Sequence, residues 1–162
     1  MKNLFTLGIS FLFLVHLNSC AISKVTLETP PPRVATFEND HSKDENYVLA
    51  NEWMVETFNN AESVIQFTDK ESGTVKGKYI IKEGFVSTSP YAASRDALFA
   101  IITIRVRDSS SRIEIAPPTG EFYSLKSMGT EYGYTPEMFE EDTNELILDF
   151  KTRMQGDVGG DW

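Results

Sequence analysis

The segment LFAIITIRVR, residues 98 to 107, places an apolar side chain at every second position. This period of two is typical of a β-strand that buries one face and exposes the other. Ile102 and Ile104 would point toward a core, while Arg105 and Arg107 would point toward solvent. Such a strand needs neighbouring strands and an apolar layer over its inner face, so the segment favours a layered fold built on a β-sheet.

Further strands are predicted on both sides of this segment. Residues 74–82 alternate between apolar and lysine side chains, and the turn sequence DKESG joins them to a shorter segment in which Ile65 and Phe67 share one side. The strands expected beside 98–107 are 34–37, 63–68, 74–82, 112–116 and 122–125, and residues 126–134 are expected to form a loop.

Two segments have the period of a helix instead. Ser42 and Glu45 have the spacing of a capping box, and Thr135 followed by Pro136 is typical of a helix N-terminus. Each start precedes an apolar stripe that would pack on a sheet. These stripes are Tyr47, Ala50, Trp53 or Met54, Phe58 and Ala61 in the first helix, and Phe139, Thr143, Leu146, Phe150 and Met154 in the second.

The elements follow the order β-α-β-β-β-β-α and predict one α+β domain over residues 34–154. Five short motifs in this region, KDENY at 43–47, EW at 52–53, VIQ at 64–66, DKESG at 69–73 and GK at 77–78, resemble a group of bacterial secreted domains of unknown function. That group has a TATA-binding-protein-like (TBP-like) fold. The resemblance implies a curved antiparallel sheet of four to five strands with two helices on one face. It implies an envelope location and no particular reaction.

The N-terminal residues predict export. Lys2 precedes an apolar run from Leu4 to Leu17, which is too short to span a bilayer and fits a signal peptide over residues 1–19. The sequence LNSC that ends at Cys20 resembles a bacterial lipobox, which implies that the Cys20 thiol receives diacylglycerol. The alternative is a buried, unreactive thiol.

The segments that flank the domain are expected to be extended. Residues 20–33 would be the lipidated cysteine and a tether stiffened by Pro30 to Pro32, and residues 155–162 would be a flexible tail. Ala21 does not resemble the aspartate that retains lipoproteins in the inner membrane. The expected location is therefore the outer membrane, facing the periplasm.

The charge of the chain excludes some partners. The sequence has 24 acidic and 15 basic residues, a net charge of −9, and removal of residues 1–19 takes away only Lys2, which makes it −10. Such a charge opposes general affinity for nucleic acid. Since Cys20 is the single cysteine, no disulfide or thiolate metal site can form within the chain, and we expect no cofactor.

Residues that could carry catalysis are few. His41 is the single histidine of the mature chain and has no partner pattern of a catalytic triad, so it is expected to be solvated or to cap a helix. Glu137, Glu141 and Glu145 would form one helical stripe that could hold a hard cation, but without other ligand motifs it is more typical of a solvated face. We expect a binding or structural domain; the alternative is an envelope enzyme with an unrecognised polar cluster.

The sheet face away from the helices is the candidate binding site. Alternation would turn basic residues onto it around an apolar patch of Ile80, Phe99 and Ile101. We expect an anionic envelope component or an acidic protein segment to bind there, with Phe99 as the buried anchor. Alternatively, the cations only solubilise the sheet, and residues 84–94 or a second subunit cover the patch. The basic residues expected there are Lys76, Lys78, Lys82, Arg105, Arg107 and Arg112.

Overall fold

The computed structural model describes residues 23–58, 65–84, 86, 94–120, 122–127 and 130–156. The signal peptide, Cys20 and most of the expected tail lie outside the described residues. In chain order, the elements are β1 (Ser23–Leu27), β2 (Arg33–Glu38), α2 (Lys43–Thr57), β3 (Ile65–Asp69), β4 (Thr74–Lys82), β5 (Leu98–Arg107), β6 (Ser110–Ala116), β7 (Phe122–Ser127), β8 (Thr130–Tyr134) and α4 (Pro136–Met154).

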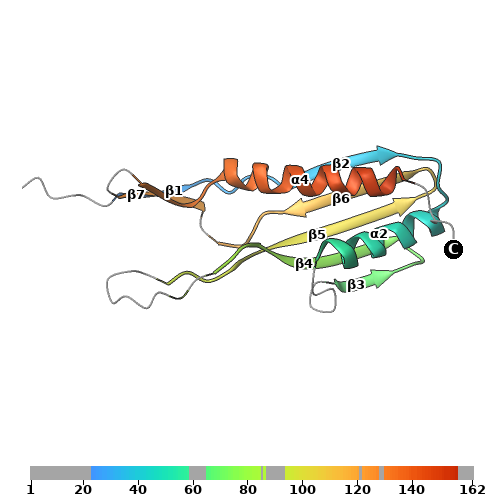
Figure 1. The fold of residues 1–162 in the computed structure, drawn as a ribbon, viewed down its shortest axis with the longest axis horizontal. Coiled ribbons are helices and arrows are strands. Elements are labelled where there is room, and N and C mark those ends of the chain that lie inside the picture. The colour runs from blue at the N-terminus through green and yellow to red at the C-terminus, as the bar shows by residue number, and fades with distance from the viewer. Residues whose placement is uncertain are drawn as a thin grey trace, which may run out of the picture.

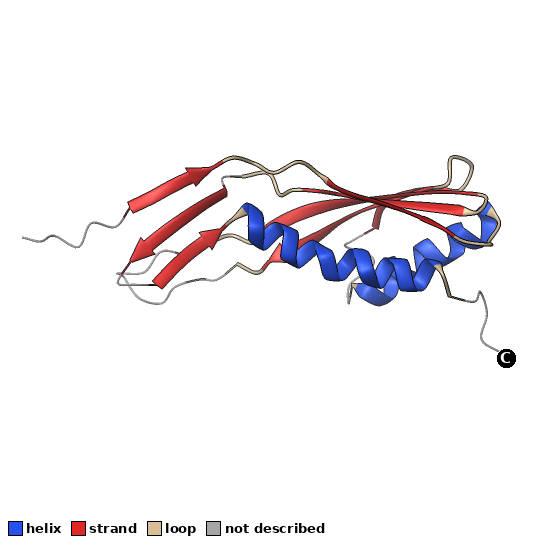
Figure 2. Ribbon diagram, turned by 90° about the horizontal axis from the view of Figure 1, so that it is seen from above, coloured by secondary structure: helices blue, strands red, loops and turns tan. Residues whose placement is uncertain are grey.

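A five-stranded antiparallel sheet forms the main layer, with the strand order β2-β6-β5-β4-β3. Helices α2 and α4 lie together on one face of this sheet (Figures 1 and 2). The predicted α+β class is confirmed. The strands of this sheet and the two helices follow the predicted order β-α-β-β-β-β-α, and β1, β7 and β8 are strands outside it.

The core lies between this sheet and the two helices. Val75, Ile102 and Ile104 on the inner face of the sheet are fully buried. From the helices, Trp53 and Phe150 pack edge to face with ring centroids 5.1 Å apart. The expected alternation of β5 is therefore confirmed, because its even-numbered residues face this core.

Both predicted helix starts are confirmed. The Ser42 hydroxyl and Glu45 carboxylate form the reciprocal capping box, and the Thr135 hydroxyl accepts from the Met138 N–H. The first helix ends at Thr57, so Ala61 does not belong to α2 and lies outside the described residues. Leu146 of the second stripe is only partly buried.

A second, three-stranded sheet has the order β1-β7-β8 and lies at one end of the molecule (Figure 1). The expectation of a loop over residues 126–134 is wrong, since β8 occupies most of it. Gly133 explains the difference: it resembles a turn residue, but a Cβ there would collide with the Tyr123 carbonyl oxygen. Glycine is needed because the two strands approach closely.

Residues 20–33 also differ from the expected tether. β1 lies within them and pairs with β7 from Ser23↔Lys126 to Leu27↔Phe122. Pro30 to Pro32 therefore connect the small sheet to β2 of the large sheet. Strand β1 is short and has a weak alternation, which the adjacent prolines obscure in the sequence.

No helix in the described part of the chain is long and apolar enough to cross a membrane.

Candidate functional site

The open face is the side of the five-stranded sheet that α2 and α4 leave uncovered (Figure 2). Residues paired across neighbouring strands project from the same face. Lys76 pairs with Thr103, Lys78 with Ile101 and Arg105 with Arg112, and the residues between them in β4 and β5 face the core. The structure therefore places five of the predicted basic residues together with the predicted anchor: Lys76, Lys78, Arg105, Arg107, Arg112 and Phe99.

Lys82 does not join this group. A β-bulge between Ile80 and Lys82 shifts the register of β4, so that Lys82 pairs with Leu98, which packs toward the core side. Strict alternation, which the sequence analysis assumed, fails at this residue. A second bulge separates Ile65 from Phe67, and Phe67 faces the open side beside Lys76 instead of sharing the side of Ile65.

Three arginines line a depression in the open face. Arg105 and Arg107 of β5 and Arg112 of β6 surround a volume of about 230 Å³. Thr36 and Ser110 add hydroxyl groups that the sequence analysis did not identify. Guanidinium groups donate paired hydrogen bonds to carboxylate and phosphate, so this lining suits an anion.

Carboxylates on the same face balance part of this charge. Glu114 Oε2 lies 3.8 Å from Arg105 Nη1 and 3.5 Å from Arg112 Nη2. Glu38 accepts a hydrogen bond of 3.2 Å from the Ser110 hydroxyl. Asp69, at the end of β3, accepts from the hairpin N–H groups of Glu71 and Ser72. The Ser72 side chain, followed by these N–H groups, holds the pKa of Asp69 below its usual value. Five cations therefore face three carboxylates.

Apolar side chains are exposed between these charges. The exposed fractions are 40% for Phe99, 45% for Ile80, 48% for Val34 and 52% for Phe67. Lys78 Nζ lies 4.2 Å from the centroid of the Phe99 ring, a cation–π contact. Val34 and Phe67 extend the predicted apolar patch across the sheet, where sequence alternation alone did not assign them.

The helix layer on the opposite side is acidic. Helices α2 and α4 together carry ten acidic and three basic residues. Charge is thus segregated between the two sides of the molecule, which explains how a chain with a net charge of −9 has a basic sheet face.

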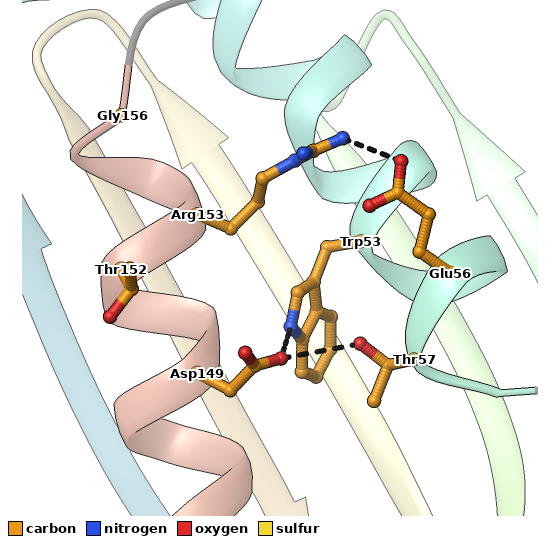
Figure 3. A pocket seen from close by; sticks show the side chains of 7 residues that line it. All are labelled: Trp53, Glu56, Thr57, Asp149, Thr152, Arg153 and Gly156. Atoms are coloured by element: carbon orange, nitrogen blue, oxygen red, sulfur yellow. Dashed lines mark hydrogen bonds and ion pairs between the residues drawn. The ribbon is translucent and has the colours of Figure 1, made fainter.

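A pocket of about 460 Å³ lies between the two helices (Figure 3). Most of its polar side chains already have partners, although the buried Nε of Arg153 has none among the described residues. Trp53 Nε1 donates to Asp149 Oδ2 at 2.7 Å, Thr57 donates to the same oxygen at 3.4 Å, and Arg153 contacts Glu52 and Glu56. These bonds join α2 to α4, so we interpret the cluster as structural.

A neighbouring cavity of about 400 Å³ is lined by Tyr79, Asp142 and Glu145 among others. Tyr134 donates to Asp142 Oδ2 at 2.9 Å, while the buried Tyr79 hydroxyl has no hydrogen-bond partner in the described part of the chain. Burial raises the pKa of both tyrosines above the usual range, and Asp142 adds to the shift. Neither hydroxyl is therefore suited to act as a base.

The other candidates from the sequence show no chemical cluster. His41 Nε2 lies 2.9 Å from the Gly156 carbonyl oxygen. The described residues contain no group of three or more histidine, cysteine or acidic side chains arranged to hold a metal ion, and this includes the Glu137–Glu145 stripe.

Comparison with known proteins gives a family and several solved structures. A family model described as a domain of unknown function (DUF4468) with TBP-like fold matches residues 37–119. A DUF4468 family protein from Bacteroides ovatus is 15% identical, with 82% of this chain and 94% of that chain covered and a TM-score of 0.49. A TBP-like protein from Parabacteroides distasonis is 13% identical, with 76% and 91% covered and a TM-score of 0.49. A search of curated proteins found no match.

Proposed function

Since the chain belongs to the DUF4468 family of domains with a TBP-like fold, we propose that it is a non-catalytic binding domain of the cell envelope. A lipid on Cys20 anchors it in the outer membrane, on the side that faces the periplasm. The open face binds an acidic partner. The domain needs no cofactor for this function.

One observation carries the proposal. The depression lined by Arg105, Arg107 and Arg112 opens on the same face as the exposed Phe99. Exposed aromatic and aliphatic side chains next to arginines are the composition of interface centres. If the face served only to keep the sheet soluble, charged side chains would be enough. The four large apolar side chains exposed among them would have no role.

The chemistry of the face favours a protein segment over a polysaccharide or a lipid headgroup. Exposed apolar side chains of β4 and β5 lie next to the cations of the same face, as the contact between Phe99 and Lys78 shows. A polypeptide in which acidic and apolar residues alternate could satisfy both kinds of contact at once. Nucleic acid is disfavoured, because the acidic helix layer would repel the rest of a long polyanion.

The binding test uses the full mature protein and three defined probes. These are a labelled peptide that alternates glutamate with leucine or phenylalanine, a polyglutamate peptide of equal charge, and an acidic polysaccharide. We expect the alternating peptide to bind most tightly, with affinity that falls as salt screens the charges. Fluorescence anisotropy measures this affinity.

Charge reversal supplies the matched control. Arg105→Glu with Arg107→Glu should abolish peptide binding. Lys70→Glu with Lys151→Glu, which changes the net charge equally but lies away from the open face, should retain it. An equal loss of peptide binding in the two variants would show that only net charge matters. If the polysaccharide binds more tightly than the peptide, the partner class is a polysaccharide.

The anchor is tested separately. Cys20→Ser should leave an unprocessed or soluble product, and mass spectrometry of the N-terminal peptide should detect diacylglycerol only on the wild type. Normal membrane retention of the variant would contradict the anchor without affecting the binding test.

A further inference from the structure

The small sheet has one face with an unusual composition. Leu125 of β7 pairs with Lys24 of β1 and with Tyr132 of β8. Tyr123 lies two residues before Leu125 in β7 and therefore projects from the same face. Tyr132 has 53% of its surface exposed, and Lys24 Nζ lies 4.9 Å from the centroid of the Tyr123 ring. We define these four residues, Lys24, Tyr123, Leu125 and Tyr132, as the tyrosine face.

This composition suits the interface of a lipid bilayer. Tyrosine combines an apolar ring with a polar hydroxyl and is enriched at the level of the lipid headgroups. Lysine places its alkyl stem along apolar surface while its ammonium group stays near the headgroups. The tyrosine face combines two such rings, a leucine and a lysine on three short strands.

The position of the sheet in the chain points to the same partner. β1 begins at Ser23, three residues after Cys20. Three residues span at most about 11 Å even when fully extended. The small sheet, which contains β1 as the first described strand, lies at one end of the molecule beyond the five-stranded sheet (Figures 1 and 2).

We infer that the tyrosine face rests on the surface of the lipid bilayer and orients the domain there. The inference rests on the proposed lipid anchor at Cys20. A lipid at Cys20 would hold the small sheet within contact distance of the headgroups, since no long tether separates them. The five-stranded sheet would then extend away from the bilayer, with its open face free to bind a partner.

Depth-dependent quenching tests this arrangement. The full-length lipidated protein is placed in vesicles of phosphatidylethanolamine and phosphatidylglycerol that carry a nitroxide near the headgroup. Tyr132→Cys is labelled with a small fluorophore, because a Cys20 thioether does not react. Val34→Cys, with an exposed fraction of 48% at the original residue, is the matched control on the five-stranded sheet. We expect the label at 132 to lose more than half of its fluorescence and the label at 34 to keep nearly all of it.

Every other result contradicts the inference in an identifiable way. Unquenched label at 132 on a protein whose N-terminal lipid is seen by mass spectrometry would overturn the tyrosine face while leaving the anchor. A blue-shifted but unquenched label would assign the face to a protein partner or a second copy. Equal quenching at 34 and 132 would show that the whole body lies on the membrane. Absence of the lipid would overturn both the anchor and this inference.

Discussion

At the scale of single residues, Gly73 determines the hairpin between β3 and β4. Its φ of +67° lies in the left-handed region, and a Cβ there would collide with the Val106 carbonyl oxygen. We expect Gly73→Ala to lower the free energy of unfolding by about 1–3 kcal/mol, measured by chemical denaturation. Gly156→Ala is the control, because a Cβ at Gly156 would make only ordinary contacts at 3.5 Å. Equal stability of the two variants would contradict this account.

Alternation in the sequence predicts the position of some residues of the candidate site and not of others. Alternation placed Arg105 and Arg107 correctly, because β5 is regular over its length. It placed Lys82 on the wrong face, because the bulge between Ile80 and Lys82 shifts the register and no sequence pattern indicates it. Glu114 could have been assigned to the open face by the same alternation that placed Arg112 two residues earlier. The buried Asn46, which donates to the Arg107 carbonyl oxygen at 3.0 Å, has no periodic signal of its own.

At the scale of elements, the start of α2 predicts a dependence on acid. Hydrogen bonds from the Ser42 backbone and side chain lower the pKa of Glu45. A lowered folded pKa stabilises the protein above the unfolded value of 4.5, and this contribution is lost as the pH falls through the folded pKa. We therefore expect Ser42→Ala to cost about 1 kcal/mol at pH 7 and less in acid, measured by denaturation from pH 7 to pH 3. A constant cost across this range would contradict the role of Glu45.

The contact between β8 and α4 predicts a dependence on base. Burial raises the pKa values of Tyr79 and Tyr134, so the stabilisation that depends on their neutral form is fully present below the unfolded value of 10.0 and is lost above it. Tyr79→Phe should be neutral or stabilising at pH 8, since its hydroxyl has no hydrogen-bond partner among the described residues. Tyr134→Phe should cost about 1 kcal/mol through its lost hydrogen bond.

Denaturation from pH 8 to pH 11 compares these variants with the wild type. Each variant should lose less stability in base than the wild type does. A strong destabilisation by Tyr79→Phe at pH 8 would show that its hydroxyl has a partner.

Elements with a chemical start signal were the most predictable. The caps at Ser42 and Thr135 predict where both helices begin, and alternation predicts the bounds of β4 and β5. The small sheet was missed as a unit, because β1 and β8 are only five residues long and β8 contains Gly133. Strand β1 pairs with β7, about a hundred residues later in the chain, and no local pattern in the sequence indicates that pairing.

At the scale of the whole molecule, charge and shape explain the candidate site. The two acidic helices bury their apolar stripes on one face of the sheet, which leaves the basic residues of β4, β5 and β6 on the other. The sequence predicted this division from two periods, 3.6 for the helices and 2 for the strands. It could not predict the arginine depression, because that depends on the register between β5 and β6, where Arg105 and Arg112 become direct neighbours.

Helix α4 contacts both sheets and should make the molecule unfold as one unit. Phe139, near its start, lies 6.2 Å from Phe122 of the small sheet, and Phe150, near its end, lies 6.2 Å from Phe37 of the large sheet. In a Trp162→Phe background, Trp53 fluorescence reports on the large sheet and amide exchange in β7 reports on the small one. The two probes should give the same free energy of unfolding.

Phe139→Ala should separate these two transitions. Removing a buried phenylalanine costs about 3–5 kcal/mol where its contacts lie, and Phe139 contacts the small sheet through Phe122. The amides of β7 should then exchange at a lower free energy than the Trp53 transition reports, because local opening of the small sheet no longer breaks the contact with α4. Phe150→Ala, a similar truncation beside Trp53, should lower the Trp53 transition instead. If the wild-type amides of β7 already exchange well below the Trp53 transition, the two sheets are independent units and α4 does not couple them.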